Sequence, residues 1–154
     1  MRVRIVVADQ AEARFFDLEP PATTLQVSGR LLDPSARLHE RERVSDLPGR
    51  VFDRAPAAGA RRGAVAHHDT GGERSARRES TVVFVRRIVA QLEQAHQQGR
   101  FERLVLMAQP RVLGMLRATL PVQLERCVVA EVHKDLVHQG DEAVRAHIPP
   151  QALG

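Results

Sequence analysis

Aromatic residues are scarce in this chain, which has no tryptophan, no tyrosine and five phenylalanines among its 154 residues. A surface with so few rings stacks nucleic-acid bases poorly, which argues against a conventional platform for single-stranded RNA. The hydrophobic fraction is nevertheless 43%, just under the usual globular range, so a packed core is expected. That core must be built mainly from Val, Leu, Ile and Ala.

Several other features are missing. Cys127 is the single cysteine, which excludes an internal disulfide. No apolar run approaches the roughly 20 residues of a membrane helix, and Ile5–Ala8 is too short for the hydrophobic region of a signal peptide. We therefore expect a cytoplasmic protein without a membrane segment. Nucleotide-binding glycine motifs are absent and no spacing matches a metal site, so neither a cofactor nor a metal is expected.

Lysine is almost absent too, because Lys134 is the only lysine among 23 basic residues and the rest are arginine. The planar arginine fork suits phosphate and carboxylate, which points to an anionic partner. A coding bias towards arginine is the alternative explanation. Between Arg50 and Arg87 nine arginines face four acidic residues, a net charge of +5 against +4 for the whole chain.

Short apolar or alternating runs predict strands, and the first three are joined by short connections typical of an antiparallel meander. The later strands alternate with helices, which calls for parallel crossovers. We therefore predict one α/β domain over residues 1–154, with a mixed sheet of about five strands and helices on its faces. The predicted strands cover residues 3–8, 13–18, 25–31, 104–108 and 128–132.

Three helices are predicted after the meander. Apolar residues at Val82, Val85, Val89 and Leu92, widened by Ile88 and Ala95, follow a 3.6-residue period and predict a long helix. Gly99 supplies its stop signal. The predicted helices run from about Glu73 to Gln98, from Pro110 to Leu120, and from about Glu142 to His147.

Residues 36–72 form a long segment rich in Arg, Ala and Gly that lacks bulky apolar side chains over its second half. Such a composition cannot bury enough surface to order itself, so we predict a loop that is disordered in part. Loops of this length inside a domain are usually functional or disordered. Docking of a protein partner on this loop is therefore one hypothesis.

Two glycines followed by arginines mark the start of the long helix. Free N–H groups and a partial positive charge make a helix N-terminus a binding place for anions. The alternative is a solvated helix end whose arginines pair locally with Glu73 and Glu79. The predicted anion- or RNA-binding residues are Gly71, Gly72, Arg74, Arg77 and Arg78, together with Arg50 and Arg111.

A possible catalytic group lies in the loop. His39, Ser45 and Asp46 are close in sequence, and His133 follows the last strand, where ligand groups collect in open α/β sheets. Together they define a small-hydrolase hypothesis. A structured turn in which Ser45 or Asp46 caps a neighbour is the alternative, so whether the chain is an enzyme stays open.

The chain resembles a known family, the bacterial host-attachment proteins. The resemblance spans most of the sequence, and its most specific part runs from Leu38-His39-Glu40-Arg41 to Pro48-Gly49-Arg50. It is carried by residues 5–9, 13–16, 36–41, 44–50, 99–101, 103–106, 113–114 and 134–136.

That family in turn resembles the middle domain of archaeal and eukaryotic peptide-chain release factors, where a Gly-Gly-Gln loop precedes an Arg-rich long helix. Here Gly71-Gly72-Glu73 precedes Arg77-Arg78. The resemblance implies a release-factor-like fold and an association with RNA or the ribosome. Glu73 stands in place of the glutamine and cannot donate the same hydrogen bonds, so peptide-release activity is not implied. An RNA- or ribosome-associated module is the leading hypothesis, with a hydrolase or a protein-interaction module as alternatives.

Overall fold

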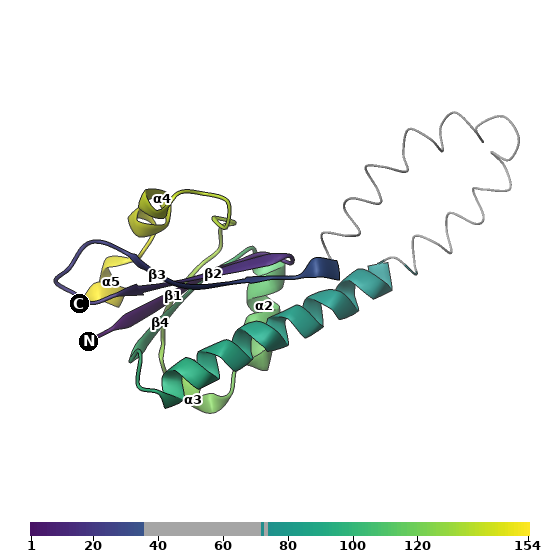
Figure 1. Ribbon diagram of the computed structural model, residues 1–154, viewed down its shortest axis with the longest axis horizontal. Helices are drawn as coiled ribbons and strands as arrows, with labels where there is room; N and C mark the ends of the chain where they lie inside the picture. The colour runs from purple at the N-terminus through teal and green to yellow at the C-terminus, as the bar shows by residue number, and fades with distance from the viewer. Residues whose placement is uncertain (36–71, 73) are drawn as a thin grey trace, which may run out of the picture.

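The computed structural model describes residues 1–35, 72 and 74–154 of the chain, and Figure 1 shows a single sheet flanked by helices. The sheet has five strands in the order β3-β2-β1-β4-β5. The predicted α/β class with a five-stranded mixed sheet is therefore confirmed. The strands are β1 (Val3–Ala8), β2 (Glu12–Leu18), β3 (Gln26–Leu32), β4 (Arg103–Met107) and β5 (Val128–Val132).

Strand β1 occupies the centre of the sheet. It pairs antiparallel with β2 and parallel with β4, so that Val3 lies opposite both Leu18 and Arg103. β2 pairs antiparallel with β3, and β4 pairs parallel with β5. The predicted meander and the predicted parallel second half are both confirmed. All six residues of β1 are buried because helices cover both faces of the sheet.

The helices form two layers. The long helix (residues 74–97), α2 (Pro110–Thr119) and α3 (Val122–Glu125) contribute to one apolar cluster, which contains Val6 of β1. α4 (Asp141–Ala146) and α5 (Pro150–Leu153) contribute to a second cluster on the opposite face, which contains Ile5. Within the described part of the chain, no helix is long and apolar enough to cross a membrane.

The long helix packs through a stripe that differs slightly from the predicted one. Val85, Val89 and Leu92 are buried as expected, whereas Val82 is only partly buried. Phe84, which the predicted stripe leaves out, is 1% exposed and belongs to the core. The structure also contains α3 and α5, which were not predicted because four residues are too few to show a helical period.

Candidate nucleic-acid interface

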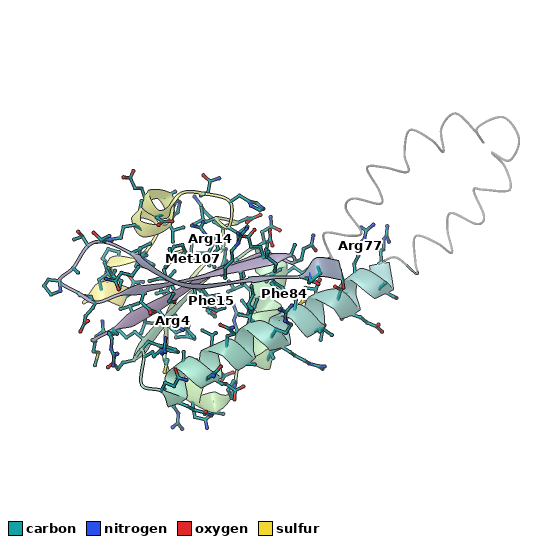
Figure 2. The ribbon with its side chains drawn as sticks, viewed as in Figure 1. Arg4, Arg14, Phe15, Arg77, Phe84 and Met107 are labelled. Atoms are coloured by element: carbon teal, nitrogen blue, oxygen red, sulfur yellow. The ribbon has the colours of Figure 1, made fainter. Side chains whose placement is uncertain are left out.

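The first turns of the long helix carry the arginines that the sequence singles out. Figure 1 shows these turns extending past the ends of the strands, and Figure 2 places Arg77 on them. Over residues 74–87 the helix has five arginines and one acidic residue, Glu79, which is a net charge of +4. Helix formation here is favoured by a run without Gly or Pro.

Arg74 and Arg78 lie on the same side of the long helix as the residues that pack against the sheet closer to its C-terminus. Positions 74, 78, 85 and 92 fall within about 40° of one another on a helix with 3.6 residues per turn. Val85 and Leu92 are buried against the sheet, whereas Arg74 and Arg78 are exposed. The stripe therefore changes from apolar to cationic where the helix passes beyond the strands. We call residues 74–78 the arginine segment.

The arginines of this segment differ in whether they already interact with other groups of the protein. Neither Arg74 nor Arg78 has a hydrogen-bond or ion-pair partner within the described ranges. Arg77 is partly buried and makes an interaction of its own. Further along, Arg87 donates to the carbonyl oxygen of Leu32 at 3.1 Å. Arg74 and Arg78 are thus the cations of this segment that can take an external anion.

A buried carboxylate anchors this part of the helix to the end of β3. Asp33 is 5% exposed and accepts hydrogen bonds from Ser80 Oγ at 2.8 Å and from the backbone N–H of Ser35 at 3.0 Å. Its own N–H donates to the carbonyl oxygen of Ala11 at 2.8 Å. A cavity of about 340 Å³ lies beside this anchor. The anchor fixes the direction in which the arginine segment projects.

Of the remaining predicted anion-binding residues, Gly72 is helical and lies two positions before Arg74, whereas Arg111 lies on another helix. Gly72 is exposed, and a Cβ added there would meet no atom within 4 Å. Arg111 is exposed on the first turn of α2, a different helix, next to Pro110. Arg50 and Gly71 lie outside the described residues.

The hydrolase hypothesis is largely untested by the structure, because His39, Ser45 and Asp46 also lie outside the described residues. His133 is exposed directly after β5. In the described part of the chain, no hydrogen bond or ion pair brings His133 to a hydroxyl or thiol nucleophile. The roles of these four residues stay predictions.

Sequence reasoning missed a charged cluster at the edge where the parallel strands end. The Nε2 atom of His138 lies 3.5 Å from Asp9 Oδ2, and its Nδ1 atom lies 4.0 Å from Glu12 Oε1. Glu12 is 6% exposed and pairs with Arg30 at 2.7 Å, and this hydrogen bond raises the pKa of the Arg30 guanidinium. Asp9 directly follows β1 and His138 belongs to the segment after β5, but no local sequence pattern connects the two residues.

The same edge is held together by Arg14 of β2. Its guanidinium donates to the carbonyl oxygens of Val137 and Gln139 and to the Asp141 carboxylate, at 3.1, 2.7 and 2.8 Å. Among the described residues no group of acidic, His or Cys side chains is arranged to hold a metal ion. The contacts at this edge therefore tie the segment after β5 to the sheet and present no acid–base pair beside a nucleophile.

A family described as "Protein required for attachment to host cells" matches residues 4–148. No curated protein matches the chain. A solved archaeal translation termination factor, aRF1, shares 10% identity at a TM-score of 0.49, covering 98% of this chain and 36% of the factor. A second archaeal protein shares 10% identity at 0.46, covering 94% and 35%. The chain thus spans about a third of the length of these structures.

Proposed function

The chain belongs to the family of proteins required for attachment to host cells, and from this premise we propose that its biochemical activity is binding RNA through the arginine segment. The family description names a cellular property and no chemistry, so the molecular role is argued from the residues. We propose that the protein binds RNA in the cytoplasm. The proposed activity includes no peptide release, because Glu73 replaces the glutamine of the release-factor loop.

The observation that carries the proposal is the change of the helix stripe from apolar to cationic. Arg74 and Arg78 take positions that further along are occupied by buried Val85 and Leu92. Cations on the first turn of a helix are unfavourable by a few tenths of a kcal/mol or more, because the helix dipole is positive there. A polyanion beside this segment removes that cost. Phosphate groups match the arginine fork and bind helix starts.

RNA is favoured over other anions by the resemblance of the loop and helix to the release-factor middle domain. The described surface also suits contacts with the backbone more than contacts with bases. Phe15, Phe16, Phe84 and Phe101 are all buried, and Phe52 lies outside the described residues. Arginine contacts to phosphates fix position without reading sequence. We therefore propose binding with little sequence preference and strong dependence on salt.

The test is a binding titration of the full chain against fluorescently labelled ribosomal RNA fragments at several salt concentrations. The variant Arg74→Glu/Arg78→Glu should lose at least about tenfold in affinity, and the slope of log affinity against log salt should become shallower by about two. Arg77 is left unchanged because its side chain is already engaged. Circular dichroism checks that the variant keeps its helical content.

Arg100→Glu/Arg126→Glu is the matched control. Both arginines are exposed, neither belongs to the arginine segment, and the pair changes the net charge by the same amount. We expect this control to weaken binding by less than about threefold, since distant exposed charges are screened. Equal losses in the two double variants, or no binding by the native chain at low salt, would refute the proposal.

A further inference from the structure

A second and larger cavity lies at the opposite end of the sheet from the arginine segment. It has a volume of about 750 Å³, within the range of small-molecule sites. The turn between β2 and β3 forms one wall with Pro20 and Pro21, and Arg2 and Arg100 form the other. Figure 1 shows this turn beside the chain start, at the end of the sheet where β1 begins. No residue of this cavity belongs to the proposed RNA surface.

The acidic residue Asp17 in the lining of the cavity has a charge that is already balanced. Asp17 accepts two hydrogen bonds from the Arg4 guanidinium, at 2.8 and 2.9 Å. Arg4 is 5% exposed, and its guanidinium lies 5.4 Å from the centre of the Phe101 ring. Because Arg4 is enclosed and paired, it neutralises Asp17 permanently. Asp17 therefore does not repel an anion as an isolated carboxylate would.

Both walls are held in place by contacts with the body of the protein. The carbonyl oxygen of Thr23 in the turn accepts a hydrogen bond from Arg145 at 2.8 Å, and within the turn the N–H of Ala22 donates to the backbone carbonyl oxygen of Glu19 at 2.9 Å. On the other side the N–H of Arg2 donates to the Glu102 carboxylate at 2.7 Å, and its guanidinium donates to the carbonyl oxygen of Gly99. A ligand would thus enter a site that is already formed, which reduces the entropy lost on binding.

The cationic wall has a charge without a partner. Arg100 is exposed and lines the cavity, and among the described residues its side chain makes no hydrogen bond or ion pair. Among the described residues, the Arg2 guanidinium has one acidic partner, Glu102 at 3.8 Å, and this ion pair is weak because both side chains are well exposed. Glu19 is the one unbalanced acid of the lining and belongs to the opposite wall. The charge is therefore asymmetric across the cavity.

We propose that this cavity binds a small organic anion. Its carboxylate or phosphate group pairs with Arg100 and Arg2, and its apolar body lies against Pro20 and Pro21. The proline wall offers an apolar surface with little conformational freedom to lose. The two arginines supply directed donors for a planar or tetrahedral anion. This site is independent of the RNA surface, so either proposal can fail alone.

The experiment is a titration of the isotope-labelled full chain, followed by amide chemical shifts. The probes are benzoate, phenyl phosphate and the neutral benzamide, which share one ring and differ in the charged group. Benzoate or phenyl phosphate should shift amides of residues 17–26 and 99–102 saturably, with dissociation constants at or below about 1 mM. The stronger of the two identifies the anion class. Benzamide should bind at least about tenfold more weakly, because it lacks the charge.

Arg100→Ala should weaken binding of the better probe at least about fivefold, through loss of the paired cation. Arg126→Ala, an exposed arginine outside the cavity, is the control and should leave binding unchanged within about twofold. Both variants should keep the amide spectrum of the folded chain elsewhere. Saturable shifts absent up to about 10 mM, equal binding of benzamide and benzoate, or equal effects of the two variants would overturn the proposal.

Discussion

Removing the carboxylate of Asp17 should destabilise the protein more than removing the guanidinium of Arg4, although the two side chains form one ion pair. The asymmetry comes from burial. The Arg4 side chain is 6% exposed and that of Asp17 is 28% exposed. Figure 2 shows Arg4 on the opposite face of the sheet from Arg14. Asp17→Ala leaves the buried Arg4 guanidinium without a charged partner. Arg4→Met leaves the Asp17 carboxylate unpaired, but water can reach it from the neighbouring cavity.

The magnitudes follow from these exposures. Breaking a buried pair by removing one partner costs about 3–5 kcal/mol, and partial exposure of Asp17 places its removal at about 3 kcal/mol. Arg4→Met keeps a side chain of similar length beside Phe101 and should cost about 1 kcal/mol. The double variant should resemble Arg4→Met, because no stranded cation remains. A difference of about 2 kcal/mol corresponds to about 4–8 °C in melting temperature for a chain of this size.

Urea unfolding followed by far-ultraviolet circular dichroism is the appropriate assay, because the chain has no tryptophan or tyrosine to report by fluorescence. The four proteins of the double-mutant cycle are compared at equal m-values, so that differences in midpoint report stability. Equal costs for the two single variants would refute the argument from burial. A double variant whose cost is the sum of the single costs would show that the pair is not coupled.

Three further predictions concern the core, two glycines and the cysteine. Leu92 is 0% exposed, so Leu92→Ala should lower the free energy of unfolding in urea by about 2–5 kcal/mol, and Leu92→Met should lower it by less than about 1.5 kcal/mol. A small loss of stability in Leu92→Ala would contradict close packing at this position. Gly99→Ala should destabilise the protein by about 1–2 kcal/mol, because Gly99 has a φ of 69° that an L side chain rarely adopts. Gly114→Ala should instead stabilise it by about 0.5–1 kcal/mol, because Gly114 lies inside α2 and an added Cβ would meet open space. Effects of the same sign for the two substitutions would contradict this contrast. Partial burial raises the pKa of the Cys127 thiol, so less thiolate is present at pH 8 than in an unstructured peptide. Its reaction with a disulfide reagent should therefore be slower in the folded chain than in the urea-unfolded chain, and equal rates would contradict this.

Element type was predictable from the sequence because helices and strands leave a local period. The run from Val3 to Ala8 has the apolar character of a strand covered on both faces, and the structure places it in the centre. The long helix and α2 were found through their stripes and through Gly99 and Pro110. The four-residue helices α3 and α5 leave no such period. Their positions depend on the strands against which they pack.

The sequence predicted the candidate nucleic-acid interface only as a segment with many arginines. The arginine segment stood out because its arginines follow one another along a helix. In the cluster of Asp9, Glu12 and His138, the histidine is 129 positions from Asp9 and 126 from Glu12, and no local pattern connects them. The large cavity likewise needs the turn after β2 and the segment after the long helix to meet.

The sequence by itself determined the class of fold, the order of its elements and the excess of arginine over lysine, because these follow from residue type and local spacing. Only the tertiary structure decided what each arginine does. Arg4 is enclosed with Asp17, Arg14 ties the segment after β5 to β2, and Arg74 and Arg78 are exposed beyond the strands. The same side chain takes these different roles because its burial and its partners depend on which elements lie beside it, and this arrangement exists only once the sheet and its two helical layers have assembled.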